Sequence, residues 1–368
     1  MFGRISRQRL ALAVLALVVL ASSCLAATAP RNVILLIGDG MGIGPVTAAR
    51  CAGPGRGGRL AMDTMPYTGF SITYAANALV TDSAAAGTAL ATGVKTNNGM
   101  ISVDPSGKRV KTILELAREM GKATGIVSTK FITDATPAVF VAHADSRSKN
   151  EEIAAQMVHS GVDVVLGGGR QYFVPVSGGG ARKDDRDLLD EAIKLHYSVV
   201  DSADAMSKST SHRLIGLFAP SIMTSDRPEP TIAEMTAKAI STLSANAKGF
   251  FMMSEGGKID SMGHANDATG NTKETLMFDE AVRTALNFAK KDGHTLVIVT
   301  ADHDTGGLVV LEPSKDNPVF TPGWVNKGHD ENMVPIYAYG PGAESFTGTH
   351  DNTEIPRMIA GLWGKKLN

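Results

Sequence analysis

The chain has 368 residues, a formal net charge of −1 and 20% charged residues. That length is sufficient for a single large α/β domain with an extensive core. The near balance of charge excludes both the basic surplus expected of a nucleic-acid-binding protein and the acidic tail typical of a disordered one. Glycine is abundant, at 39 residues, and aromatic residues are sparse, at 5%, which favours many tight turns and close backbone approaches.

The first 29 residues predict a secretory signal peptide. Three arginines within the first nine residues precede an apolar run over 10–21, and Ala27-Thr28-Ala29 is typical of a cleavage site. The apolar run is shorter than the roughly 20 residues that a transmembrane helix needs. Lipid attachment at Cys24, which would anchor the protein to a membrane, is the alternative. We therefore expect an exported protein, periplasmic or extracellular, in which a single domain covers residues 30–368.

Beyond the signal, strand-like and helix-like segments alternate along the chain. Strands are predicted at 33–37, 124–128, 162–166, 249–253, 295–299 and 334–339. Helices are predicted at 111–120, 150–160, 186–195, 230–246, 273–291 and 353–362. The segments 53–59 and 172–185 are predicted to be loops, and 200–228 is poorly patterned. This alternation predicts an α/β fold, a three-layer sandwich with a largely parallel central sheet flanked by helices.

Metal-ligating residue types follow several predicted strands. Asp39 comes directly after the first strand, and Asp302 and His303 follow the strand at 295–299. Because ligands gather beyond the carboxyl ends of parallel strands, these residues are candidates for one site. A solvated turn is the plain alternative for each of them.

The segment SEGGKIDSMGH, residues 254–264, adds Glu255, Asp260 and His264 after another strand. Asp260 and His264 are four residues apart, so one helical turn would place both on the same face. Mixed nitrogen and oxygen ligands suit zinc, whereas an all-oxygen set suits magnesium. The pattern therefore predicts a site for divalent metal ions, with a polar loop at the sheet edge as the alternative.

Two further segments contain residues suited to phosphate chemistry. Ser83 lies at the start of the predicted helix in VTDSAAAGTALATG, where free N–H groups favour an anion, although Asp82 or Ser83 could simply cap that helix. Arg147 follows the turn that contains Thr136, and its planar guanidinium suits a phosphate group. His350 precedes the last predicted helix and by itself is more typical of a capping or surface residue.

Taken together and in order, these segments resemble the alkaline phosphatase family. The matching stretches are IGDGMG, VTDSAAAGTA, GVKTNNG, TDATPAVFVAHADSR, EGGKIDSMGH, TADHDTGG and GTHDNTEIP. The resemblance implies an alkaline phosphatase-like fold and a phosphomonoester hydrolase that releases inorganic phosphate through a phosphoserine. It also implies two zinc ions, one magnesium ion and, as an expectation, a homodimer.

The resemblance assigns roles to individual residues. Ser83 would be the nucleophile, and Arg147 would hold the phosphate oxygens. Three groups of metal ligands are implied: Asp260, His264 and His350 for the first zinc, Asp39, Asp302 and His303 for the second, and Asp39, Thr136 and Glu255 for magnesium. Ser261 and Asp304 depart from the residues that some family members carry, which is expected to alter phosphate affinity or the zinc environment.

Two other functions compete with this one. A phosphodiesterase or a phosphate mutase would use a similar metal site, whereas a sulfatase is excluded because Ser83 is followed by Ala84, Ala85 and Ala86 rather than by a Ser/Cys-x-Pro-x-Arg context. An exported phosphate-binding or metal-binding protein without turnover is a rival of a different class. It would not need a serine beside two metal sites.

Overall fold

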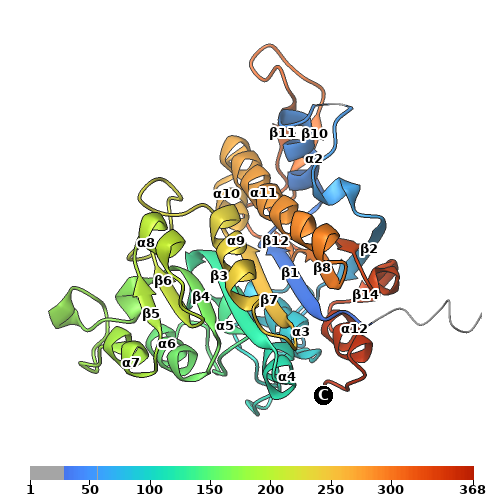
Figure 1. Cartoon of the computed structure of the whole chain (residues 1–368). Helices are drawn as coiled ribbons and strands as arrows, with labels where there is room; N and C mark the ends of the chain where they lie inside the picture. The colour runs from blue at the N-terminus through green and yellow to red at the C-terminus, as the bar shows by residue number, and fades with distance from the viewer. Residues whose placement is uncertain (1–28, 56) are drawn as a thin grey trace, which may run out of the picture.

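The fold is built on one ten-stranded sheet (Figure 1), here in a computed structural model that describes residues 29–55 and 57–368. The strand order is β14-β2-β13-β8-β1-β7-β3-β4-β6-β5. Every neighbouring pair in it is parallel except the two pairs that β13 makes, with β8 and β2. Cys24 and all but the last residue of the predicted signal peptide lie outside the described residues.

The strands of this sheet are short to medium in length. Their bounds are β1 (Asn32–Gly38), β2 (Tyr67–Ile72), β3 (Ala123–Phe131), β4 (Val164–Gly168), β5 (Ser198–Val200), β6 (Leu214–Leu217), β7 (Phe250–Gly256), β8 (Thr295–Thr300), β13 (Val334–Tyr339) and β14 (Gly348–Asp351). Two small antiparallel pairs lie outside it: β9 (Asp304–Thr305) with β12 (His329–Asp330), and β10 (Val309–Leu311) with β11 (Thr321–Gly323).

Helices cover both faces of the sheet. Their bounds are α2 (Ile43–Ala52), α3 (Ser83–Thr92), α4 (Ile113–Glu119), α5 (Ala135–Ala138), α6 (Asn150–His159), α7 (Leu188–Lys194), α8 (Ala203–Lys208), α9 (Ile232–Leu243), α10 (Lys258–Ala265), α11 (Ala268–Asp292) and α12 (Glu354–Leu362). Side chains of α9 and α11 pack into one core cluster, and those of α3, α4, α6 and α12 pack into another. The result is the predicted three-layer sandwich (Figure 1).

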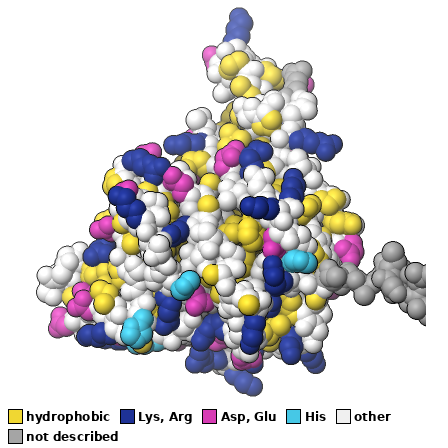
Figure 2. Space-filling model, viewed as in Figure 1, with side chains coloured by type: hydrophobic (Ala, Val, Ile, Leu, Met, Phe, Trp, Pro, Cys, Tyr) yellow, Lys and Arg dark blue, Asp and Glu magenta, His cyan; other side chains and the backbone are white. Residues whose placement is uncertain are grey.

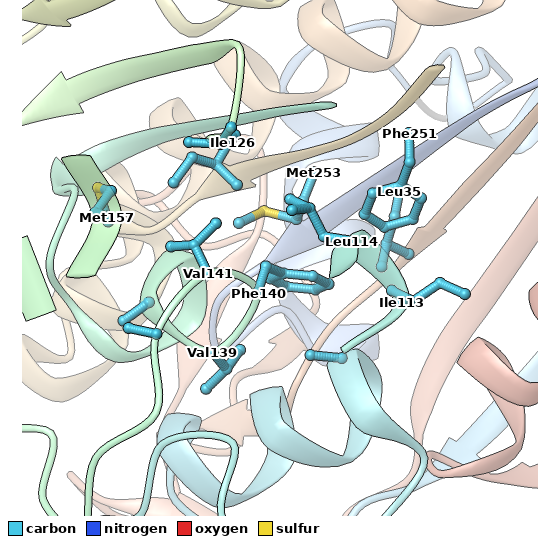
Figure 3. Close-up of a cluster of buried hydrophobic side chains, with 14 of the residues drawn as sticks. Leu35, Ile113, Leu114, Ile126, Val139, Phe140, Val141, Met157, Phe251 and Met253 are labelled. Carbon is cyan, nitrogen blue, oxygen red and sulfur yellow. The ribbon is translucent and has the colours of Figure 1, made fainter. Parts of the chain in front are cut away.

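Alternation along the central strands explains the two cores. In β1, Val33, Leu35 and Ile37 belong to one cluster, whereas Ile34 and Leu36 belong to the other. Successive side chains of a strand point to opposite faces, so a continuous apolar run is buried on both sides. Figure 3 shows the first cluster, where Phe140 lies near Leu35, Met253 and Phe251. Burial of each such side chain contributes roughly 1.5–3 kcal/mol.

The predicted fold class is confirmed, and so are the central elements. All six predicted strands and all six predicted helices are present, with ends shifted by a few residues. The sequence prediction missed the edge strands β14 and β5 and their neighbours β2 and β6, and the segment 200–228 contains α8 and β6. In β2 and β14 small or polar residues interrupt the strand, and β5 and β6 have only three and four residues. None of the four has an apolar run as long as those of the central strands.

The visible surface of the described residues has no large patch of a single charge sign that would indicate a binding partner (Figure 2). Basic and acidic side chains are interspersed on the face that Figure 2 displays, in keeping with the net charge of −1. Within the residues that the structure describes, no helix has the length and apolar character needed to span a bilayer.

Candidate active site

The site lies beyond the carboxyl ends of the central strands. Asp39 follows β1, and Glu255 lies near the end of β7 opposite Ile37 of β1. Asp302 lies two residues beyond β8, whose Thr300 is also paired with Ile37. Because these three strands are adjacent and parallel, their ends bring the carboxylates to one edge of the sheet.

Gly40 allows the chain to turn directly after Asp39. Its φ is 71°, and a Cβ on it would lie 2.6 Å from Thr305 Oγ1 and 2.9 Å from Asp260 Cα. Its N–H donates to Asp302 Oδ1 at 3.1 Å, which ties the turn to the loop after β8. Glycine is therefore required here both for the left-handed backbone and for close approach of the neighbouring segments.

Asp39, Asp302 and His303 form a fully buried group of metal-ligand type. His303 Nε2 lies 3.3 Å from Asp302 Oδ2 and 3.6 Å from Asp39 Oδ1, and these two carboxylate oxygens have no hydrogen-bond partner. Burial and the neighbouring carboxylates raise the pKa of Asp39 to about 7, and burial raises that of Asp302 to about 6. Orphaned buried carboxylate oxygens fit a bound cation, because an uncompensated buried charge is costly.

A second group consists of Asp260, His264 and His329. Asp260 and His264 share one face of α10, as their spacing predicts, and His264 Nε2 lies 3.2 Å from Asp260 Oδ1. His329 Nε2 lies 3.2 Å from His264 Nε2 and 3.5 Å from Asp260 Oδ1. Two imidazole nitrogens and a carboxylate oxygen at these distances are donors that suit a zinc ion. Asp260 and His329 also form a group of metal-ligand type with His303.

Backbone carbonyl groups orient the rings of His264 and His329 through their Nδ1 atoms. His329 Nδ1 donates to the carbonyl of Thr81 at 2.9 Å, and His264 Nδ1 donates to the carbonyl of Lys327 at 2.6 Å. In a neutral ring, that leaves the Nε2 lone pair directed at the group. The ring of His329 also stacks on that of His303, with centroids 3.6 Å apart, so the two groups adjoin.

His329, not His350, completes this group, and the prediction for His350 is wrong on geometry. The ring nitrogens of His350 face Glu354 Oε2 at 3.3 Å and the carbonyl of Thr347 at 3.1 Å. His350 lies on β14, which is separated from β8 by β2 and β13. Three strand spacings amount to roughly 14 Å. The sequence prediction missed His329 because it lies in β12, a two-residue strand with no apolar run before it.

Ser83 is the first residue of α3, and its hydroxyl is free of capping. Asp82 is the N-cap, and its side chain accepts the N–H of Ala85 at 2.9 Å. The structure thus assigns the capping role to Asp82. Ser83 Oγ lies 3.1 Å from His303 Nε2, at the edge of the first group. The serine hydroxyl is therefore placed next to the residues that could hold a metal ion.

Arg147 is held by two carboxylates, one of them on Asp82, the residue before this serine. Its guanidinium donates to Asp82 Oδ2 at 3.1 Å and to Asp134 Oδ1 at 3.0 Å. Despite its burial, these carboxylates raise the pKa of Arg147 further above its usual range. The arginine is about one-third exposed, so a ligand can reach its planar donor edge.

Thr136 and Glu255 lie deeper, at the ends of α5 and β7. Thr136 Oγ1 and Glu255 Oε1 are buried without a partner, while Glu255 Oε2 accepts the hydroxyl of Ser128. Burial, with the charge of Asp39, raises the pKa of Glu255 well above its usual range. Unsatisfied oxygens of this kind suit a hard cation.

Lys130 is a residue of this site that sequence reasoning missed. Its ammonium lies 3.1 Å from Asp39 Oδ2, 3.1 Å from Asp260 Oδ2 and 3.5 Å from Asp134 Oδ2. Burial lowers the pKa of Lys130, but these carboxylates more than offset it, and the pKa is raised well above its usual range. The only sequence signal was a lysine at the end of a strand, four residues before Asp134.

Asp304 is not part of either metal-ligand group. Its carboxylate abuts Gly42 and accepts from Asn332 Nδ2 at 3.3 Å. The Asp304 carboxylate therefore does not contact the expected zinc ligands through these interactions, and the predicted effect of this residue on the zinc environment has no direct structural basis.

Comparison with known proteins identifies the family. The alkaline phosphatase family model matches residues 30–320. The chain is 38% identical to the alkaline phosphatase of Escherichia coli, over 91% of this chain and 86% of that one. It is 36% identical to the streptomycin-6-phosphate phosphatase of Streptomyces griseus, over 99% of each.

Solved structures agree with this result. The alkaline phosphatase of the Antarctic bacterium TAB5 superposes with a TM-score of 0.83 at 37% identity, covering 90% of this chain and 98% of that one. A histidine-to-aspartate variant of that enzyme is described as having Mg bound in its M3 site. The chain therefore belongs to the alkaline phosphatase family of metal-dependent phosphomonoester hydrolases.

Proposed function

We propose that this enzyme hydrolyses phosphomonoesters through a phosphoserine at Ser83, with two zinc ions beside that residue. The observation that carries the proposal is the placement of the Ser83 hydroxyl 3.1 Å from His303, next to buried carboxylates whose oxygens lack partners. Asp39, Asp302 and His303 would hold one zinc ion with Ser83. Asp260, His264 and His329 would hold the other.

When bound, the zinc pair supplies positive charge that favours a deprotonated hydroxyl and neutralises the transferring phosphoryl group. Ser83 Oγ attacks phosphorus, the bond from phosphorus to the ester oxygen breaks, and the alcohol departs with a proton. Water then attacks the phosphoserine, releasing inorganic phosphate and restoring the serine. Arg147 binds the non-bridging oxygens in both steps, and Asp82 and Asp134 hold its guanidinium in place.

The expected magnesium ion fits the residues only in part. Thr136 Oγ1 and Glu255 Oε1 are orphaned oxygens that suit it. The remaining expected ligand is Asp39, whose Oδ2 accepts from the Lys130 ammonium. No step of the proposed reaction depends on magnesium.

The test is hydrolysis of a chromogenic phosphomonoester and of the matching diester by zinc-loaded protein. Ser83→Ala is expected to lower monoester turnover by a factor of at least about 10³. The matched control is Ser160→Ala, because that hydroxyl donates to the carbonyl of Met157 in α6 and accepts the N–H of Val162, and neither residue belongs to the site. Brief exposure to substrate followed by acid quenching should show phosphate on Ser83 by mass spectrometry. Preference for the diester would move the function to phosphodiesterase, and unchanged turnover in Ser83→Ala would refute the phosphoserine.

The alternative function, a phosphate-binding protein that does not hydrolyse esters, is distinguished from an enzyme by the same variant. A pure phosphate-binding protein would show no hydrolysis in its unaltered form. If Ser83→Ala still binds inorganic phosphate but has lost turnover, the enzyme is established and the binding role alone is rejected.

Export of the chain is part of the proposal, supported by the charged and then apolar start of the sequence. Expression of the full chain in a bacterium, followed by fractionation and N-terminal sequencing, tests it. A new N-terminus near residue 30 in the periplasm or medium is the expected result. A lipid-modified Cys24 in the membrane fraction would instead support the anchored alternative. The expected homodimer is tested by light scattering of the same mature protein.

A further inference from the structure

Lys130 places a fixed positive charge in the middle of the carboxylate cluster. The residue is 7% exposed, and its ammonium contacts Asp39, Asp134 and Asp260 at 3.1–3.5 Å. Asp39 and Asp260 belong to the two separate zinc-ligand groups. A single ammonium therefore bridges both groups and also contacts the carboxylate that holds Arg147.

The local chain is built to hold this side chain. Between Val127 and Phe131, β3 advances four residues while its partner β4 advances two, so β3 bulges there. A bulge re-aims side chains, and this one directs Lys130 towards the end of β1. The backbone N–H of Lys130 donates to Ser128 Oγ at 3.0 Å, which fixes the strand at this point.

Gly257 provides the space for the aliphatic part of Lys130. A Cβ on Gly257 would lie 2.9 Å from Lys130 Cγ and 3.1 Å from Lys130 Cδ. The stem of the lysine therefore runs directly over the glycine backbone, where any larger residue would displace it. The position of the ammonium follows from this packing as well as from the ion pairs.

The ammonium competes with the expected magnesium ion for Asp39. One oxygen of that carboxylate, Oδ1, faces His303, and the other, Oδ2, accepts from Lys130. A divalent ion shared by Asp39, Thr136 and Glu255 would have to approach the oxygen that the ammonium occupies. Two cations at that oxygen repel each other strongly in a buried site.

We propose that the Lys130 ammonium is the third cation of this active site and excludes magnesium from it. The inference rests on the two-zinc phosphatase function proposed above. Lys130 is a positioning residue: it holds Asp39 and Asp134, which in turn hold the zinc group and Arg147. The zinc-loaded enzyme then needs no magnesium.

The experiment measures magnesium binding without turnover, so its failure is distinct from failure of the phosphatase assignment. Zinc-loaded protein is dialysed against millimolar magnesium, and its metal content is measured by mass spectrometry. The thermal midpoint is recorded with and without magnesium. The variant is Lys130→Ala, and the matched control is Lys122→Ala. Lys122 is similarly buried directly before β3, where its ammonium donates to the carbonyls of Arg31 and Lys248 and lies over the ring of Trp363.

The expected result is zinc without magnesium in the unaltered and Lys122→Ala proteins. Lys130→Ala should gain one magnesium ion per chain, and its thermal midpoint should rise when magnesium is added. One magnesium ion per chain in the unaltered protein, with an affinity that Lys130→Ala leaves unchanged, would overturn the proposal. Absence of magnesium from both proteins would also overturn it, because the ammonium would then not be what excludes the ion. If Lys130→Ala fails to fold, Lys130→Gln keeps most of the side chain's length without its charge and is interpreted in the same way.

Discussion

The ring of His329 is oriented for ligation by a backbone contact that no local sequence pattern reveals. The Thr81 carbonyl fixes its Nδ1, so its Nε2 faces Asp260 and His264. Such outer contacts matter because they set both the tautomer and the ring direction. At the scale of single residues, His329 and His350 are both histidines in polar segments, and they differ in place: His329 lies in β12, outside the ten-stranded sheet, whereas His350 lies in its edge strand β14.

His329→Ala is therefore expected to weaken zinc binding by at least about 100-fold and to lower phosphatase turnover in parallel. His350→Ala is the matched control and should retain both, because its ring contacts only Glu354 and Thr347. Competition with a chromogenic zinc chelator gives the affinity, and steady-state assays give the turnover. Loss of zinc from His350→Ala, with His329→Ala unaffected, would restore the original assignment.

Single residues were predictable where spacing or strand ends carried the signal. Asp260 and His264 were recognisable as a helical pair, and Asp39 and Asp302 as residues following buried strands. His329 was not, because it lies in β12, a two-residue strand. Lys130 was missed for another reason: its side chain is aimed by a bulge, and a bulge follows from pairing with β4 rather than from the sequence of β3.

At the scale of elements, two helical glycines differ in whether a side chain could be accommodated at their position. A Cβ on Gly44 in α2 would collide with the backbone carbonyl of Leu308, so the helix and the loop after β9 approach through that glycine. Gly361 lies in α12, is exposed, and would place its Cβ in open space. The first glycine is needed for packing, whereas the second only weakens its helix.

Gly44→Ala should therefore lower the free energy of unfolding by about 1–3 kcal/mol, because a backbone atom cannot move aside as a flexible side chain can. Gly361→Ala should raise it by about 0.4–1 kcal/mol through reduced entropy of the unfolded chain. Urea unfolding of the zinc-loaded proteins measures both. The packing argument fails if Gly44→Ala is as stable as the unaltered protein.

Elements with long apolar runs were predictable, and the sheet edges were not. The strand at 334–339 was predicted with its observed bounds, because VPIYAY is apolar over its full length. By contrast, β14 has the sequence GTHD, and β5 has only three residues. Such strands form because a neighbour offers unpaired hydrogen-bonding groups, which is a property of the sheet and not of their own sequence.

For the whole molecule, the active site depends on contacts between distant parts of the chain. The N–H of Gly40 bonds to Asp302, 262 residues further along. The sheet brings such segments together, and the two core clusters exclude water from both of its faces. The carboxylates at the strand ends are thus buried by the fold itself, and the charge that Lys130 leaves unbalanced must be balanced by bound cations or by protons.

Removal of zinc should consequently make stability depend strongly on pH. In the metal-free protein the pKa of Asp39 is about 7 and that of Asp302 about 6, against 3.8 for an ordinary aspartate. Between about pH 4 and pH 7 the unfolded chain has lost protons that the folded protein still holds. Stability therefore falls as pH rises, by an amount on the order of 4 kcal/mol for Asp39 alone.

The histidines of the site act on the same balance. Burial lowers the pKa of His329, but hydrogen bonding to Asp260 more than offsets this effect and raises that pKa to about 9. The stability that protonated His329 adds to the folded protein is therefore lost as pH rises from about 6.5 to 9. Burial lowers the pKa of His303 to about 4, which acts in the opposite direction below about pH 6.5. Because several carboxyl groups outweigh that one imidazole, the net slope stays negative from about pH 5 to 9.

Binding of the proposed zinc ions should reverse this trend, because ligands bind zinc in their deprotonated forms and the affinity therefore rises with pH. The thermal midpoint of chelator-treated protein should thus decrease steadily from pH 5 to pH 9, while that of zinc-loaded protein should hold or increase. Calorimetry of both samples in matched buffers measures the widening difference. A midpoint of the chelator-treated protein that rises over this range would mean that the buried carboxylates are already ionised without metal. The fold would then have to balance their charge through Lys130 and Arg147 alone.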